Sequence, residues 1–176
     1  LHFVSLEGAG FPLGSEVSFL KSELATTWLL DVVGPTVLAL SARVGLAGAL
    51  GATPDLPIED RFFAGGETTI RGYGRNRVGP VDESGNPRGG NTRILLNAEW
   101  RFPIWRFVSG ALFVDTGTVR PDTPDLRLSE FKTGVGGGLR LVTPVGPLRF
   151  DVGYGLNPVR GDEDRLAFYF SVGYPF

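Results

Sequence analysis

The sequence contains no cysteine and no methionine. Without thiols the chain cannot form disulfide bonds or thiolate-bound zinc and iron–sulfur centres, although this leaves the cellular compartment open. Because methionine is absent, there is no initiator residue, and we expect the chain to be a processed or excised piece of a longer product. The composition points to no cofactor.

Positive charge and imidazole are also scarce. The 17 basic residues do not outweigh the 19 acidic ones, and the formal net charge is −2. Proteins that bind the phosphate backbone are usually basic, so we predict no nucleic-acid partner. The only histidine is His2, at the chain end. A polar pair such as Ser109 and Asp115 therefore lacks the imidazole base that would activate the serine as a nucleophile. We therefore predict that the chain is not an enzyme and has no catalytic residues.

Acidic residues cluster in two short stretches, DESG near Asp82 and GDED near Asp162. Their carboxylates could hold a hard cation, but acidic turns of this kind are more often solvated. We therefore assign no metal ligand.

Long hydrophobic runs are lacking too. No stretch of about 18 apolar residues occurs, which excludes a transmembrane helix. The 26 glycines and 13 prolines favour short strands and turns. Apolar and polar residues alternate with a period of two in about eight segments, and this predicts an all-β fold of antiparallel strands. In the last segment one face carries only apolar residues, namely Leu166, Phe168, Phe170, Val172, Tyr174 and Phe176.

One connection is much longer than the others. It covers about residues 49–91, between the third and fourth predicted strands. Loops of this length are rare in compact domains, so it is expected to be either functional or disordered. No break in composition divides residues 1–176, and we predict a single β-barrel domain.

The two faces of the predicted strands differ in chemistry. The outward face has leucine, valine and aromatic residues without charge over about ten residues per strand, as expected for contact with lipid. The other face combines glycines with charged residues, which fits a wet or crowded lumen; its charged members are Arg93, Glu99, Arg101, Asp115, Arg140, Arg149 and Asp151. Because lipid offers no hydrogen-bond partner to an open edge, the strands must close on themselves or on another chain. A soluble sandwich or barrel with one buried face is the alternative.

Several motifs in order resemble the C-terminal half of the barrel in the BamA/TamA superfamily of outer-membrane insertases and translocators, also called surface-antigen proteins. The similarity runs from about Arg61 to Phe176 and more weakly back to Leu1. The motifs are RFFAGGETTIRGYG, NAEWRFP, ALFVDTGTV, GPLRFDVGYGLNP and FYFSVGYPF. The resemblance implies a transmembrane β-barrel in a bacterial or organellar outer membrane.

The resemblance also implies a docking site. In this family the long loop folds back into the lumen, and an Arg-Gly-aromatic tripeptide at its tip contacts the inner wall. Here the tripeptide is Arg71, Gly72 and Tyr73, and the matching wall residues are Glu99, Phe113 and Asp115. The alternation of the strands independently places these three wall residues on the inward face. A guanidinium and carboxylates in a constricted lumen can form bidentate hydrogen bonds. The AGG segment at residues 64–66 is expected to make a second close approach to the wall.

The end of the chain resembles the sorting signal that the barrel-assembly machinery reads in its clients. Alternating aromatic residues end in a terminal aromatic residue in such signals. The residues that match are Phe168, Phe170, Tyr174 and Phe176. The same side chains are also expected to face lipid, and both interpretations can hold together.

The chain departs from the family in length. The family's barrel has sixteen strands and is usually preceded by soluble POTRA domains, whereas no POTRA-like unit is present here. The chain is therefore either half of a sixteen-strand barrel or a small barrel that closes with about eight strands. A closed eight-strand barrel is nearly filled by its own side chains, so the loop could not lie wholly inside. Two copies joined edge to edge would instead make a sixteen-strand ring.

The leading functional hypothesis is assistance in the insertion or translocation of outer-membrane proteins. The expected partners are outer-membrane lipid, unfolded outer-membrane protein clients, and either a second copy or the missing N-terminal half of the barrel. The alternative is a passive pore or structural barrel, which would conduct without accelerating client folding.

Overall fold

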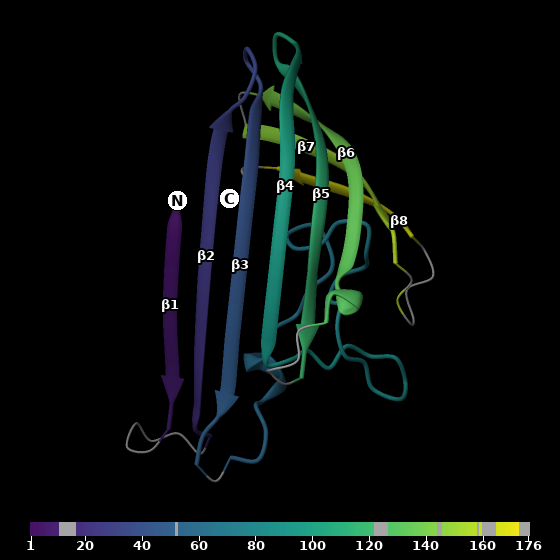
Figure 1. The fold of residues 1–176 in the computed structure, drawn as a ribbon. Helices are drawn as coiled ribbons and strands as arrows, with labels where there is room; N and C mark the ends of the chain where they lie inside the picture. The colour runs from purple at the N-terminus through teal and green to yellow at the C-terminus, as the bar shows by residue number, and fades with distance from the viewer. Residues whose placement is uncertain are drawn as a thin grey trace.

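Eight antiparallel strands form one sheet in chain order (Figure 1). The computed structural model describes residues 1–10, 17–51, 53–121, 127–143, 146–157, 159 and 165–172. The strands are β1 (His2–Ala9), β2 (Phe19–Asp31), β3 (Val37–Ala49), β4 (Thr92–Trp105), β5 (Val108–Arg120), β6 (Lys132–Thr143), β7 (Gly146–Gly155) and β8 (Leu166–Val172). The predicted all-β, antiparallel fold is confirmed.

The alternation of the sequence becomes an alternation of burial. In β7, Arg149 and Asp151 are buried, while Phe150 and Val152, which alternate with them, are exposed. Successive side chains of a strand point to opposite faces, so the apolar residues lie on the convex face and the charged residues on the concave face. The concave face therefore carries the polar chemistry of the molecule.

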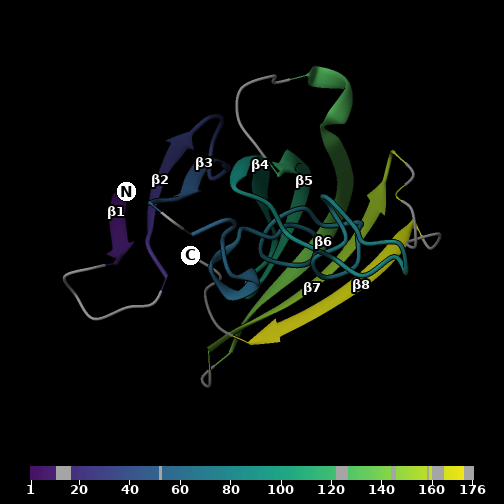
Figure 2. The ribbon, with the colours of Figure 1, turned by 90° about the horizontal axis from the view of Figure 1, so that it is seen from below.

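The sheet is open, and β1 and β8 are its two edges. Within the described residues, β1 pairs with β2 and β8 pairs with β7. The described strands thus form one curved sheet and do not complete an eight-strand ring. Figure 2 shows how the sheet curves, with β4 to β8 wrapping around a central space.

The connection between β3 and β4 occupies that space (Figure 2). It includes a short 3₁₀ helix, η1 (Ile58–Asp60), and its segments are joined by isolated bridges such as Phe62 with Gly90 and Ala64 with Val78. A second 3₁₀ helix, η2 (Leu128–Glu130), lies between β5 and β6. The buried apolar cluster joins the connection to β4 and β5 and consists of Ala64, Ile70, Tyr73, Val78, Leu95 and Val119. The core thus lies between the long connection and the inner wall of the sheet.

The two ends of the sheet differ. At one end the strands are joined by short connections, residues 32–36 and 106–107, while the 50–91 connection leaves from the other end (Figure 1). Among the residues described, no helix is long and apolar enough to cross a membrane.

Candidate functional site

The tip of the long connection contacts the inner wall through Arg71. Its guanidinium lies 2.6 Å from Glu99 on β4, 2.7 and 2.9 Å from the two carboxylate oxygens of Asp115 on β5, and 3.1 Å from Asp151 on β7. The backbone N–H of Arg71 also donates to Asp115, at 3.1 Å. All four side chains are at most 4% exposed. One loop cation is therefore shared by carboxylates from three strands.

The pairing with Asp115 is bidentate, because Nε and Nη2 of Arg71 reach different oxygens of one carboxylate. Burial alone would lower the pKa of Arg71, but the hydrogen bonds and charges of Asp115 and Glu99 outweigh burial and raise its pKa above the ordinary value. Arg71 consequently remains charged in this buried position. A buried charge of this kind is tolerated because its partners and hydrogen bonds are in place.

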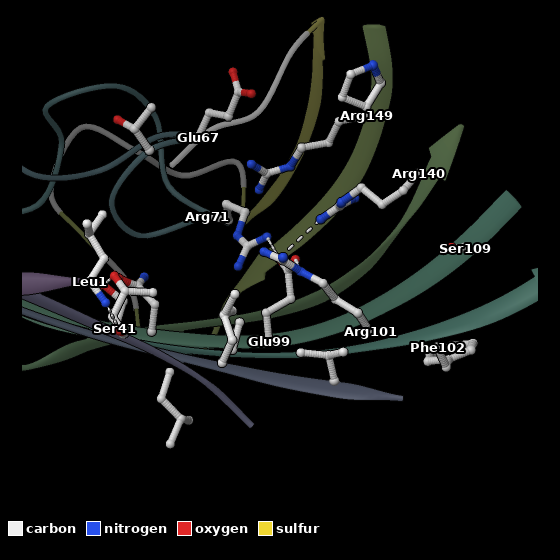
Figure 3. Close-up of a pocket in the computed structure, with 18 of the residues that line it drawn as sticks. Leu1, Ser41, Glu67, Arg71, Glu99, Arg101, Phe102, Ser109, Arg140 and Arg149 are labelled. Carbon is white, nitrogen blue, oxygen red and sulfur yellow. Dashed lines mark hydrogen bonds and ion pairs between the residues drawn. The ribbon is translucent and has the colours of Figure 1, made fainter. Parts of the chain in front are cut away.

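Three further arginines pair with Glu99 or Asp151, and Figure 3 shows Arg101, Arg140 and Arg149 on the same side of the sheet as Arg71 and Glu99. Arg101 donates to Glu99 at 2.8 Å, and Arg140 bridges Glu99, at 3.1 Å, and Asp151. Arg149 donates to Asp151 at 2.6 Å. With Arg71, four guanidinium groups thus meet three carboxylates. We call these seven side chains the lumenal ion network: Arg71, Glu99, Arg101, Asp115, Arg140, Arg149 and Asp151.

An aromatic ring supports Arg71 from the wall. The guanidinium carbon lies 3.4 Å from the ring centroid of Phe113. A cation over an aromatic face is attracted by the ring's electron distribution, most strongly when both are shielded from water. Phe113 is itself 3% exposed and packs where a side chain on Gly136 would collide with its ring.

The backbone of the tip lies directly on the wall. Gly72 has a φ of +95°, a conformation that favours glycine, and a Cβ there would come within 2.6 Å of the backbone of Tyr154. On the wall, a Cβ at Gly153 would lie 2.6 Å from the nitrogen of Gly72, and one at Gly134 would overlap the carbonyl oxygen of Arg71. Glycines on β6 and β7 thus leave the space that the tip fills.

Two tyrosine hydroxyls also hold the tip in place. The hydroxyl of Tyr73 donates to the carbonyl oxygen of Thr133, at 3.0 Å, and accepts from the backbone N–H of Asn157, at 3.1 Å. Tyr169 on β8 accepts a hydrogen bond from the N–H of Gly72, at 3.0 Å, and donates to the carbonyl oxygen of Tyr73, at 2.9 Å. The tip is therefore attached to β6, to β8 and to the segment that follows β7.

The AGG segment does not make the expected second approach to the wall. A Cβ at Gly65 would collide with the carbonyl oxygen of Gly74, and Val78 donates its N–H to the carbonyl oxygen of Ala64. The close approach is therefore between two parts of the connection itself. The expectation was wrong because residue spacing shows that a tight contact is possible but not which backbone provides it.

A second attachment to the wall comes from Phe62. Its ring lies where a Cβ of Gly45 on β3 would be 2.5 Å away. Lys21 and Arg93 lie over the same ring, at 5.2 and 4.9 Å from its centroid, and Arg93 pairs with Glu23 on β2. The connection is thus anchored on β2 to β4 as well as on β5 to β8.

A cavity of about 770 Å³ lies beside the lumenal ion network. Its lining includes Arg43, Arg101, Arg140 and Arg149, together with residues near the short connections such as Pro35. Within the described ranges, no group of three or more histidine, cysteine, aspartate or glutamate side chains could hold a metal ion.

The predicted site residues fall into two groups. Arg71, Glu99, Phe113 and Asp115 meet in one cluster, and Gly72 and Tyr73 lie beside it. Of the proposed terminal signal, Phe168 and Phe170 are exposed on the convex face of β8, and the Phe170 ring lies 4.8 Å from that of Phe150. Tyr174 and Phe176 lie outside the described residues.

Three features of the site were not predicted. Asp151, Arg140 and Arg149 were placed on the inward face by alternation, but no pattern indicated that they reach Arg71 or its partners. Tyr169 alternates with Phe168 and Phe170 and so lies on the face opposite theirs, but no pattern indicated its hydrogen bonds to the loop tip. The inward glycines of β6 and β7 gave a signal, since glycines at alternate positions of a strand indicate a close backbone approach.

The fold and the site together define a class of protein. An open, curved sheet with an apolar convex face and a charged concave face, filled by one fastened loop, is part of a large membrane-type β-barrel. Residues 3–176 match the Omp85 superfamily domain, and the chain belongs to this superfamily.

The relatives include bacterial and organellar proteins. The chain is 29% identical to the outer membrane protein assembly factor BamA of Neisseria meningitidis, with 93% of this chain and 24% of that protein covered. It is 31% identical to BamA of Nitratidesulfovibrio vulgaris, with 95% and 22% covered. It is also 31% identical to the chloroplastic outer envelope protein 39 of Arabidopsis thaliana, with 79% and 35% covered. The chain spans about a quarter of the length of the BamA relatives.

A solved structure has the same fold. The crystal structure of BamA from Haemophilus ducreyi lacking POTRA domains 1–3 matches with a TM-score of 0.66 and 22% sequence identity. The match covers 88% of this chain and 35% of that one.

Proposed function

We propose that this chain forms the C-terminal half of an outer-membrane barrel that assists the insertion or translocation of outer-membrane proteins. The observation that carries the proposal is the long connection held inside the curved sheet by Arg71. Relatives that carry the name outer membrane protein assembly factor match over nearly all of this chain. The proposed activity is that of the whole barrel, of which this chain supplies a part.

The surface chemistry supports a position in a bacterial or organellar outer membrane. The convex face is apolar and exposed on neighbouring strands, and its residues include Leu96, Trp100, Leu112, Val114, Leu139, Phe150, Val152, Phe168 and Phe170. An outward apolar band of this kind is typical of transmembrane barrels. Such barrels have short turns on the periplasmic side and longer loops outside, so the 50–91 connection enters the lumen from the outer side. Lipid is thus the first proposed partner.

The open edges β1 and β8 require further partners. Hydrocarbon cannot satisfy unpaired backbone groups, so in the membrane both edges must pair with other strands. We propose that the remaining strands of a sixteen-strand barrel close the ring, and that a second copy of this chain is the alternative source of those strands. The junction at β1 or β8 would then be the place where strands of unfolded outer-membrane protein clients are received.

The lumen is built for a docked loop, which separates this proposal from a passive pore. In the lumenal ion network each carboxylate of β4, β5 and β7 is paired with at least one guanidinium, and the loop occupies the concave face. Removing one partner from a buried ion pair costs about 3–5 kcal/mol because the remaining charges are left uncompensated. The docked loop is thus costly to release, which is unnecessary in a barrel that only conducts.

The test replaces Arg71 in the membrane-inserted protein. Arg71→Ala should undock the loop and lower the rate at which a small outer-membrane barrel folds into vesicles that contain the protein. Arg71→Lys keeps one charge but loses the fork of donors, so it should give an intermediate rate. Arg75→Ala is the matched control, because Arg75 belongs to the same connection and is exposed.

Client folding is followed by the heat-dependent shift of the folded client on gels, and the protein's own folding is checked in the same way. If Arg71→Ala folds and accelerates client folding as well as Arg75→Ala does, the role of the docked loop in the activity is refuted. Conductance without any acceleration by the unaltered protein would favour the passive pore.

A further inference from the structure

The edge strand β8 has an attachment that the ladder of the sheet does not explain. β8 has seven residues and pairs with β7 from Leu148–Val172 to Tyr154–Leu166. Tyr169 lies in the middle of β8, opposite Asp151, and turns inward between the exposed Phe168 and Phe170. Its hydroxyl reaches across to the tip of the long connection.

Tyr169 forms two hydrogen bonds with the tip, because a phenol hydroxyl can both accept and donate. The oxygen accepts from the N–H of Gly72, at 3.0 Å, and the O–H donates to the carbonyl oxygen of Tyr73, at 2.9 Å. The two bonds therefore hold the backbone on both sides of one peptide unit. This unit joins Gly72 to Tyr73, directly after Arg71, and Gly72 has a φ of +95°.

We propose that Tyr169 is a positioning residue that couples the edge strand β8 to the docked state of the loop. When Arg71 leaves the lumenal ion network, the peptide unit that Tyr169 holds moves with it, and β8 loses its two hydrogen bonds to the loop tip. When β8 moves away from β7, the tip loses the two bonds from Tyr169. Coupling between two sites is reciprocal, so each event makes the other easier by the same factor.

The other contacts of the tip given above involve other segments. The hydroxyl of Tyr73 bonds to Thr133, in β6, and to Asn157, after β7. The glycine contacts of the tip involve Gly134 on β6 and Gly153 on β7. Tyr169 thus connects loop docking to the strand at the open edge. Its consequence for client entry rests on the proposed function, whereas the coupling itself does not.

The test measures amide hydrogen exchange in the membrane-inserted full chain with Tyr169→Phe. This substitution keeps the ring and removes the hydroxyl. A net contribution of about 1 kcal/mol per hydrogen bond corresponds to roughly 5-fold faster exchange for each bond lost. We expect exchange to increase by about 5-fold or more both in β8 and around residues 70–73, while β2 and β3 are unchanged.

Two matched variants make the result specific. Tyr154→Phe removes the same atom from a tyrosine on the convex face of β7, and both segments should exchange as in the unaltered protein. Tyr73→Phe removes the bonds to Thr133 and Asn157, so it should speed exchange at the tip more than in β8. An increase spread evenly over β2, β3 and β8 in Tyr169→Phe would overturn the proposal, because it would indicate general destabilisation.

A double-mutant cycle tests the coupling directly. Arg71→Lys should speed the exchange of β8 in the unaltered background and have little further effect when Tyr169→Phe is present. Additive effects of the two substitutions on β8 would overturn the proposal. The client-folding assay reports separately on the proposed function: an unaltered protein that does not accelerate client folding would refute that function and leave the exchange result standing.

Discussion

Gly153→Ala gives a prediction whose size follows from the packing of the loop tip. A Cβ at Gly153 would lie 2.6 Å from the nitrogen of Gly72 and 3.0 Å from the carbonyl carbon of Arg71. These are backbone atoms, so no side-chain rotation can relieve the contact. Ordinary contact begins at 3.4 Å, and the tip must therefore move by about 0.8 Å, the difference between 3.4 and 2.6 Å.

A movement of this size is about as large as the lengthening that the ion pairs of Arg71 can tolerate. Arg71 lies 2.6 Å from Glu99 and 2.7 Å from Asp115, so a shift of about 0.8 Å away from the wall takes both close to the limit of a hydrogen bond. Overpacking of this kind costs about 1–3 kcal/mol. It outweighs the gain of about 0.5–1 kcal/mol that alanine has over glycine inside a strand. Gly153→Ala should therefore lower the free energy of unfolding.

The control is Gly48→Ala on β3. A Cβ there has no heavy atom within 4 Å, so only the gain of about 0.5–1 kcal/mol remains and the protein should become slightly more stable. Urea titration of the vesicle-inserted protein measures both free energies of unfolding, and protease cleavage within residues 50–91 reports whether the loop is docked. Equal stability changes and equal protection from cleavage in the two variants would refute the role of the glycine wall.

Two further substitutions test the ion network and its aromatic support. Asp115→Asn should lower the free energy of unfolding by about 3–5 kcal/mol, because it removes the bidentate partner of a buried guanidinium. The same urea titration should show a change within about 0.5 kcal/mol for Glu83→Gln, at an exposed position of the 50–91 connection. Phe113→Leu should cost about 1–2 kcal/mol through the lost contact with the Arg71 cation. It should exceed the effect of Phe150→Leu on the convex face in the same titration, and an equal effect would show that the ring does not support Arg71.

Much of the wall could be predicted from the sequence because strands obey a strict period. Alternation places Glu99, Phe113 and Asp115 on one face, and each of them is 3% exposed or less on the concave side. The resemblance to a family supplied Arg71 as the loop residue that meets them. Membership of the family is shown by the match over residues 3–176.

The rest of the site could not be predicted because it depends on register and on the path of the loop. Alternation gives the face of Asp151 but not its height relative to Arg71, which is set by the stagger of β5, β6 and β7. The 50–91 connection has no period, so the self-contact of Gly65 and the bonds of Tyr169 had no sequence signal. Closure is also a property of pairing between strands, and the sequence allowed both an eight-strand ring and the open sheet that the structure shows.

In mechanical terms, Arg71 is a cross-brace. Its partners Glu99, Asp115 and Asp151 belong to β4, β5 and β7, while Arg71 itself belongs to none of these strands. Sliding one strand by a single residue along its neighbour would carry its carboxylate about 3.3 Å, farther than the ion pairs can stretch. With the brace in place, the wall resists shear as one curved plate. Deformation of the barrel is then left to strands outside the brace, among them the edge β1, whereas Tyr169 ties the other edge, β8, to the braced tip.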